Sequence, residues 1–171
     1  MVVVLHNGAP VTMPWVNQVK GILELYLAGE AAGEAAVRLL FGDVNPSGHL
    51  AETFRLRVED TPVYPYYGRE KEDIIYREGL LVGYRYYGTV KKETLFAFGH
   101  GLSYSEFRYS NLQLDRREMT DCETLHVSVD VENISDRTGK ALVQIYVEPL
   151  HGVSVRPVRE LRAFEKTELK S

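Results

Sequence analysis

The residues of this chain that could do chemistry gather in the segment Tyr76–Tyr104. Glu78 lies there among apolar and aromatic residues, where burial would perturb the pKa of its carboxyl group. His100 lies between two glycines, which would let backbone approach its imidazole closely. We favour a structural interpretation of both: a helix N-terminal acid or a buried acid paired with Arg77 or Arg85, and a turn histidine bonded to backbone.

Tyrosines are also concentrated here, since nine of the eleven fall between Tyr64 and Tyr109. Their rings pack against apolar surface while their hydroxyls reach polar partners. We favour an interdomain or core-edge cluster, and a sugar-stacking surface is the alternative. The candidate residues for an interdomain or substrate-adjacent role are Tyr76, Glu78, Tyr84, Arg85, His100 and Tyr104.

Spacing alone predicts no catalytic, cofactor or metal site. GEAAGEAA lacks the glycine and lysine placement of a phosphate loop, and Gly101-Leu102-Ser103-Tyr104-Ser105 fails the last position of a G-x-S-x-G elbow. The five histidines are scattered: His6, His49, His100, His126 and His151. Paired carboxylates could hydrolyse glycosides, but 24 acidic residues make some pair inevitable.

The composition of the chain limits the classes of molecule that it is expected to bind. The net charge is −4 and no basic run is present, so we expect neither nucleic acid nor an anionic membrane as a partner. No apolar run approaches the ~20 residues that span a bilayer. Cys122 is the single cysteine, which excludes an internal disulfide and favours a reducing compartment such as the cytoplasm.

The first part of the chain has an α/β pattern. The expected elements are a β-branched strand covered on both faces at Val2–Leu5, a short helix opened by Pro14-Trp15, a strand at Gly21–Tyr26, a helix at Gly29–Phe41, a short strand at Leu50–Phe54 and a surface loop at Glu59–Asp73. Two strands and a helix leave edges and an apolar face uncovered. We therefore expect a piece of a longer protein that can self-associate through exposed strand edges.

The second part has a period of two. Alternation of apolar and polar residues predicts strands at Phe107–Leu114, Leu125–Glu132 and Ala141–Val147, with a further strand at Glu160–Leu169. Short strands at this spacing are typical of an immunoglobulin-like or fibronectin-type sandwich. Four strands are fewer than the ~7 of such a sandwich, so we expect a partial one.

Several stretches together resemble one known family. They are TMPWV, GEAAGEAAVRLLFGDVNPSGHLAETF, YREGLLVGYRYY and FAFGHGLSYSEFRYS, followed by GKALVQIYVEPL and RPVRELRAFEK. In order and spacing they resemble the C-terminal half of glycoside hydrolase family 3, which contains β-glucosidases, β-xylosidases and relatives. The resemblance covers essentially the whole chain.

The resemblance implies a β/α barrel, an α/β sandwich and a fibronectin type III-like domain in the full enzyme. By this comparison residues 1–60 are the end of the α/β sandwich, 61–105 bridge the two domains, and 106–171 open the fibronectin-type domain. The segment Tyr76–Tyr104 would then be a clamp between domains, with close packing at Gly79, Gly83, Gly99 and Gly101.

The resemblance also implies a retaining β-glucosidase-like mechanism. Its aspartate nucleophile lies in a Ser-Asp-Trp-like barrel motif, and its glutamate acid/base lies upstream of the strand that VVVLHNG resembles. No residue of this chain matches either position, so we expect the chain to be inactive alone, with a carbohydrate substrate only in the full-length enzyme. The alternative is a stand-alone carbohydrate-binding or interaction module.

Overall fold

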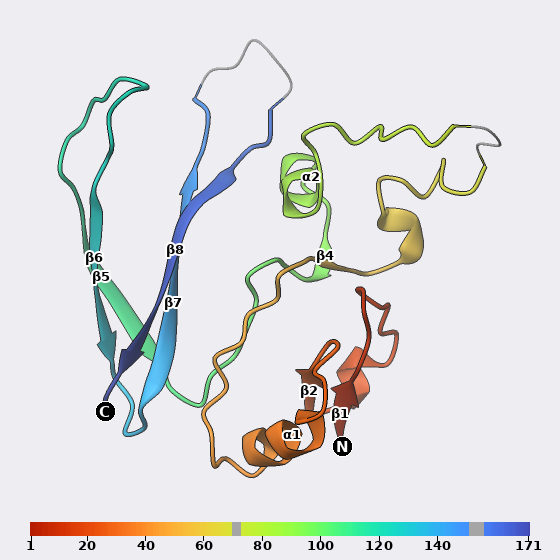
Figure 1. The fold of residues 1–171 in the computed structure, drawn as a ribbon, viewed down its shortest axis with the longest axis vertical. Helices are drawn as coiled ribbons and strands as arrows, with labels where there is room; N and C mark the ends of the chain where they lie inside the picture. The colour runs from red at the N-terminus through yellow and green to blue at the C-terminus, as the bar shows by residue number, and fades with distance from the viewer. Residues whose placement is uncertain (70–72, 151–155) are drawn as a thin grey trace. The chain divides into compact units, whose positions relative to one another are not determined.

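The structure is a computed structural model that describes residues 1–69, 73–150 and 156–171 (Figure 1). It divides into two compact units. The first unit comprises Met1–Val44, Gly48–Gly101 and Gln144–Phe164, and the second comprises Asn45–Ser47, Leu102–Val143 and Glu165–Ser171. Within the described ranges, no helix has the length and apolar character needed to cross a membrane.

The first unit begins with a parallel strand pair. β1 (Val2–Leu5) pairs with β2 (Gly21–Glu24), with Val2 opposite Gly21, and a 3-10 turn at Val16–Gln18 lies between them in the chain. α1 (Ala32–Leu40) follows. Its acid Glu34 is in the first turn and its base Arg38 is in the last, which suits the helix dipole.

A second, shorter sheet holds the buried centre of this unit. β3 (Phe54–Arg55) pairs antiparallel with β4 (Thr94–Phe96), and the Phe54 ring meets the Phe96 ring edge-on at 6.4 Å. Phe54 is only 1% exposed. Between the two strands lie a 3-10 turn at Val58–Asp60 and the helix α2 (Tyr84–Thr89).

The strands of the second half form two further pairs. β5 (Phe107–Leu114) runs antiparallel to β6 (Val127–Asn133), and their register shifts between Ser110 and Gln113. β7 (Gly139–Val147) pairs with β8 (Glu160–Leu169). Along β6, half-buried and exposed residues alternate strictly, as the period-two pattern predicts.

The side chain of Asn45 organises the turns of the second unit. Its amide nitrogen donates to the Ser105 hydroxyl at 2.8 Å and to the Thr138 carbonyl at 3.0 Å. Its amide oxygen accepts from the Ser103 hydroxyl and the Tyr104 backbone N–H, both at 2.9 Å. One amide therefore satisfies four partners, which fixes the chain around residues 103–105.

The predicted α/β-then-β order is confirmed, as are β5, β7, β8 and α1 within a few residues. Other predictions differ. The expected burial of both faces of Val2–Leu5 is wrong in the described chain, because Val2 and Val4 are 50% and 37% exposed. Only Phe54 of the predicted strand Leu50–Phe54 is extended in a sheet.

Leu50 makes ladder-like contacts without belonging to a strand. Its N–H donates to the His100 carbonyl, and its carbonyl accepts the Gly99 N–H, both at 2.8 Å. The predicted surface loop Glu59–Asp73 was wrong at its start, because Asp60 is 3% exposed. Residues 70–72 of that loop lie outside the described ranges.

Candidate functional site

Three aromatic rings from distant parts of the sequence meet at Tyr84, at the start of α2. The Tyr84 ring stacks on Phe98, with centroids 4.8 Å apart, and meets the edge of Tyr146 at 5.9 Å. The Tyr84 hydroxyl also accepts the backbone N–H of Leu161 at 2.8 Å. All four residues belong to the first compact unit, so this aromatic cluster joins α2 to the chain around β7 and β8.

Two polar contacts extend the same junction along α2. The Thr89 hydroxyl accepts the Val158 N–H at 3.0 Å, and Arg85 pairs with Glu160 at 3.8 Å. Glu160 is also paired at 3.2 Å with Arg156 and Arg162. Its side chain is 16% exposed, so three guanidinium groups compensate one largely shielded carboxylate.

A cavity of about 230 Å³ lies beside the aromatic cluster. Its walls include Tyr84, Tyr87, Phe98 and Tyr146, and its lining also includes the cationic residues Lys91, Lys92 and Arg159. Burial raises the pKa of the Tyr87 and Tyr146 hydroxyls above their usual value, so both remain protonated at neutral pH. No carboxylate is among the described residues that line it, so the cavity holds no acid/base pair.

The carboxylate of Asp60 forms a buried ionic contact next to this region. It accepts from Arg57 at 3.2 Å and from Lys92 at 3.0 Å. The hydrogen bond from Arg57, followed by that from Lys92, holds the pKa of Asp60 below its usual range. Asp60 therefore ties the 3-10 turn to the turn after α2 and has no free oxygen for chemistry on a substrate.

A second cluster of acids lies at the carboxyl end of β2. Glu24 accepts the Tyr26 backbone N–H at 2.7 Å. Burial, together with the charges of Glu52 and Glu24, raises the pKa of Tyr26 to about 12, and burial raises the pKa of Glu52 as well. Within the described chain, shielded side-chain atoms of Glu24 and Arg55 have no hydrogen-bond partner.

Glycoside hydrolysis uses two carboxyl groups that flank the scissile bond. Glu24 and Glu52 are therefore the carboxylates of this chain to examine if it shows activity. Sequence reasoning missed them, because β2 and the approach to β3 are far apart in the chain. No pattern in the sequence points to them; in the structure the neighbouring Tyr26 has a φ of 48°, which is unusual for a residue other than glycine.

The predicted candidates do not converge on one site. Tyr84 and Arg85 lie in the junction described above. Tyr76 is 87% exposed, Glu78 is half-buried, and Tyr104 belongs to the second unit, with the Arg137 guanidinium 5.3 Å from its ring. Arg85 pairs with Glu160 at 3.8 Å, and the pairing of Glu78 with Arg77 or Arg85 stays a prediction.

His100 lies in a turn, and its contacts fit the structural interpretation, which stays a prediction. Its ring stacks on Phe96 with centroids 5.0 Å apart, and its backbone N–H donates to the Ala97 carbonyl at 3.0 Å. Among described residues, no group of three or more histidine, cysteine or acidic side chains could hold a metal ion. His151 lies outside the described ranges.

Two of the four glycines predicted to allow close packing do so. A Cβ at Gly101 would collide with the Gly48 carbonyl oxygen and lie 2.9 Å from the His49 ring. A Cβ at Gly99, where φ is +81°, would lie 2.6 Å from the Gln144 side chain. Around Gly79 and Gly83, no atom of a described residue lies within 4 Å of the position that a Cβ would take, so close packing at these two glycines stays a prediction.

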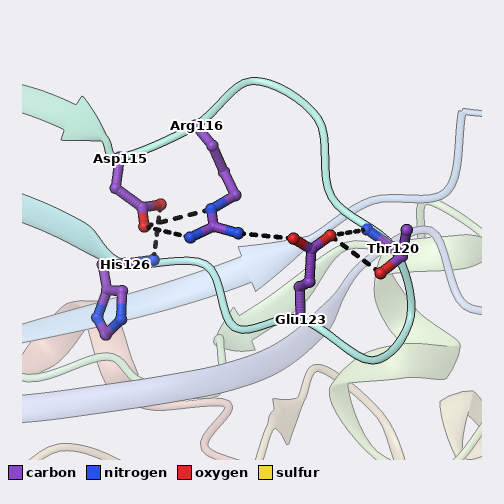
Figure 2. Close-up of polar contacts among 5 residues, drawn as sticks. All are labelled: Asp115, Arg116, Thr120, Glu123 and His126. Carbon is purple, nitrogen blue, oxygen red and sulfur yellow. Dashed lines mark hydrogen bonds and ion pairs between the residues drawn. The ribbon is translucent and has the colours of Figure 1, made fainter.

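The turn between β5 and β6 carries a cluster of charged and polar side chains that resembles a binding site (Figure 2). Its carboxylates, however, are already hydrogen-bonded within the turn. Arg116 bridges Asp115 and Glu123, at 3.3 and 2.9 Å. Glu123 also accepts the N–H and the hydroxyl of Thr120, while Asp115 accepts the His126 N–H. Because all four carboxylate oxygens have donors, the cluster stabilises the turn.

Comparison with known proteins identifies the family. Residues 1–104 match the model of the glycosyl hydrolase family 3 C-terminal domain, and residues 141–171 match that of a fibronectin type III-like domain. Tyr84 and Phe98 lie in the first match and Tyr146 and Leu161 in the second, so the aromatic cluster draws on both.

Known proteins resemble this chain both in sequence and in three-dimensional structure. The chain is 49% identical to thermostable beta-glucosidase B of Acetivibrio thermocellus over 166 residues, which are 97% of this chain and 22% of that protein. The crystal structure of a family 3 beta-glucosidase of Bifidobacterium adolescentis superposes with a TM-score of 0.92 at 41% identity, covering 99% of this chain and 25% of that one. Beta-glucosidase 3B of Thermotoga neapolitana, solved in complex with glucose, gives 0.89 at 39% identity, covering 99% and 24%.

The chain thus spans about a fifth to a quarter of the length of these proteins. The family model matches more than half of the chain. Nearly all of the chain also superposes on solved structures of family 3 β-glucosidases, which indicates the same family. The chain belongs to glycosyl hydrolase family 3, and it corresponds to the C-terminal part of the family's β-glucosidases.

Proposed function

We propose that the chain is part of a retaining β-glucosidase-like enzyme, in which it supplies structure and neither of the two catalytic carboxylates. The support is twofold. Its relatives are β-glucosidases of which it spans about a fifth to a quarter. The family resemblance of the sequence implies that both the nucleophile and the acid/base position lie in other parts of the enzyme. The carbohydrate substrate would then bind only to the full-length enzyme.

We further propose the division into residues 1–60 as the end of an α/β sandwich, 61–105 as a bridging segment and 106–171 as the opening strands of a fibronectin type III-like domain. The observation that carries the structural role is the hydrogen bond from the Leu161 N–H to the Tyr84 hydroxyl at 2.8 Å. It joins the proposed bridging segment to the fibronectin-like part within one compact unit.

The candidate residues take structural roles in this proposal. Tyr84 and Arg85 hold the bridging segment to β7 and β8, and His100 packs on Phe96. Tyr76, Glu78 and Tyr104 lie outside the contacts around Tyr84, and for them an interdomain or substrate-adjacent role is kept as a proposal. Exposed edges of β1 and β2 would promote self-association, and the single exposed thiol of Cys122 suits a reducing compartment such as the cytoplasm.

The test is an assay of the purified chain on an aryl β-glucoside. The expected result is no turnover above that of buffer, because the acid and nucleophile roles have no occupants. Matched variants sharpen it: Glu52→Gln and Glu24→Gln remove the neighbouring acids of the chain, and Glu59→Gln is an exposed control. Turnover that survives purification and disappears in Glu52→Gln or Glu24→Gln would overturn the proposal.

A further inference from the structure

One asparagine of the chain is followed by a glycine. This dipeptide is Asn7-Gly8, whereas the residues after the other four asparagines are glutamine, proline, leucine and isoleucine. Because glycine has no Cβ, its backbone nitrogen can approach the side-chain carbonyl carbon of the preceding asparagine with the least steric hindrance. The sequence thus distinguishes one position at which an asparagine amide and a backbone nitrogen can react with each other.

The backbone at this position is not held by secondary structure. Asn7 and Gly8 follow β1, which ends at Leu5, and they belong to no helix or strand. Gly8 is exposed, and its N–H donates no hydrogen bond to any residue that the structure describes. A nitrogen in a helix or a sheet ladder would have to break a hydrogen bond before it could lose its proton. The Gly8 nitrogen has no such bond to break.

The side chain of Asn7 lies along this free backbone. Its Nδ2 donates to the Ala9 carbonyl at 2.8 Å, so the amide reaches past Gly8 instead of pointing away from the chain. This hydrogen bond is exposed, and an exposed hydrogen bond exchanges readily with bonds to water. It therefore keeps the amide near the Gly8 backbone without locking it in place.

We propose that Asn7 deamidates spontaneously through a cyclic imide formed with Gly8. The Gly8 nitrogen loses its proton and bonds to the Cγ atom of Asn7, the bond between Cγ and Nδ2 breaks, and Nδ2 leaves as ammonia. Water then hydrolyses one of the two carbonyl groups of the imide ring. Hydrolysis on one side gives an aspartate at this position, and hydrolysis on the other side gives an isoaspartate, whose backbone runs through the former side chain.

The new carboxylate would lie near existing acids. Leu5 is opposite Glu24 in the β1–β2 pair, and a Cβ at Gly8 would lie 3.9 Å from the Leu27 side chain. The turn after β1 thus runs beside the carboxyl end of β2, where Glu24 and Glu52 lie. Deamidation adds a like charge there and removes the amide donor of the present hydrogen bond, so we expect the modified chain to be less stable.

Peptide mapping by mass spectrometry tests the proposal on the purified chain, incubated in mildly alkaline buffer. The peptide that contains Asn7 should gain the mass of an amide-to-acid conversion at least about tenfold faster than the peptide that contains Asn111. Asn111 is the internal control: it is exposed and its amide also donates one exposed hydrogen bond, to Asp130, but the branched side chain of Leu112 follows it. Enzymatic methylation specific for isoaspartyl residues should label the incubated chain.

Variants locate the reaction. Gly8→Ala should slow it at least about tenfold, because the added methyl group obstructs the attacking nitrogen. This variant should fold normally, since the new Cβ makes only an ordinary contact with Leu27 and the φ of Gly8 is not positive. Gly33→Ala is the matched control, with no described atom within 4 Å of its Cβ, and should leave the rate at Asn7 unchanged.

Three results would overturn the proposal: equal rates at Asn7 and Asn111, an unchanged rate in Gly8→Ala, or no isoaspartate after incubation. Asn7→Asp reproduces one product and should lower the thermal midpoint of the chain. A midpoint equal to that of the unmodified chain would overturn the expected loss of stability. The inference rests on this dipeptide and its surroundings, so the outcome of the glycosidase assay does not affect it.

Discussion

Tyr84 combines a ring contact and a hydrogen bond in one side chain. Tyr84→Phe keeps the stacking on Phe98 but leaves the Leu161 N–H without its acceptor. We expect a loss of about 1 kcal/mol in the free energy of unfolding, measured by urea denaturation, because that is the typical net value of such a bond. Tyr84→Ala should cost more, since the ring is lost too.

The control for this prediction is Tyr76→Phe, which removes a hydroxyl from a ring that is 87% exposed. Its effect should stay within about 0.5 kcal/mol. If Tyr84→Phe changed the free energy of unfolding as little as Tyr76→Phe, the hydrogen bond to Leu161 would contribute nothing to stability. In a full-length enzyme, activity should fall only in proportion to the folded fraction.

Asp60 should make the stability of the chain depend on acid pH. Arg57 and Lys92 hold its folded-state pKa below the ordinary 3.8. Its contribution is therefore complete above the unfolded-state pKa and is lost as the pH falls through the folded value. Between about pH 5 and pH 3, thermal midpoints of the unmodified chain should fall more steeply than those of Asp60→Asn.

Glu59→Gln is the neighbouring control for this pH dependence. Glu59 belongs to the same 3-10 turn as Asp60 but is exposed, so its replacement should leave the steep acid slope in place. If the thermal midpoints of Asp60→Asn and of the unmodified chain fell equally steeply with pH, the ion pairs of Asp60 would not contribute to the pH dependence of stability.

Among individual residues, the sequence predicted roles that depend on neighbours in the chain and missed those that depend on folding. The turn role of His100 follows from its flanking glycines. The proximity of Tyr26 and Glu52 does not, because it requires the chain to return from α1 to the end of β2.

At the level of elements, the turn between β5 and β6 is held by charge-assisted hydrogen bonds on the surface (Figure 2). Arg116→Ala removes the bridge between Asp115 and Glu123. Amide hydrogen exchange at Thr120 and His126 should become about tenfold faster, because their acceptors lose the group that orients them. The global melting midpoint should change little, because exposed ion pairs contribute little to stability.

Arg117→Ala is the control for this turn, since Arg117 is the exposed neighbour of Arg116. It should leave the exchange rates of both amides unchanged. Equal acceleration in the two variants would mean that the turn responds to net charge and not to the specific bridge.

The strands β1, β2 and β5 to β8 and the helix α1 were predictable because alternation and helix propensity are local, whereas β4 was not predicted and β3 was predicted only at Phe54. α2 was not predictable, because Tyr84, Tyr86 and Tyr87 favour strands and Gly88 disfavours helix. Its six residues are helical through tertiary contacts: Tyr84 on Phe98 and Tyr146, and Thr89 with Val158. A sequence pattern cannot supply such contacts.

For the molecule as a whole, the exposed valines of β1 should govern association. Val2 and Val4 are 50% and 37% exposed on a strand whose free edge can template pairing. We expect the 19.4 kDa chain to elute in size-exclusion chromatography with light scattering as a concentration-dependent mixture of monomer and larger species. Val4→Lys should shift the mixture toward monomer.

Val58→Lys is the control for association, because Val58 is 45% exposed but lies in a 3-10 turn and not on a strand edge. The mixture should be unaffected by it. A single monomeric species for the unmodified chain at every concentration would contradict the prediction.

The contact between Gly101 and Gly48 also limits how this molecule can evolve. Every replacement of Gly101 adds a Cβ atom, and that atom would strike a backbone oxygen, which cannot turn aside as a flexible side chain can. At Gly33, by contrast, no atom of the described residues lies within 4 Å of the position that a Cβ would take. A substitution at Gly101 would therefore require the backbone at Gly48 to shift, so we expect accepted substitutions at Gly101 to be accompanied by changes near Gly48.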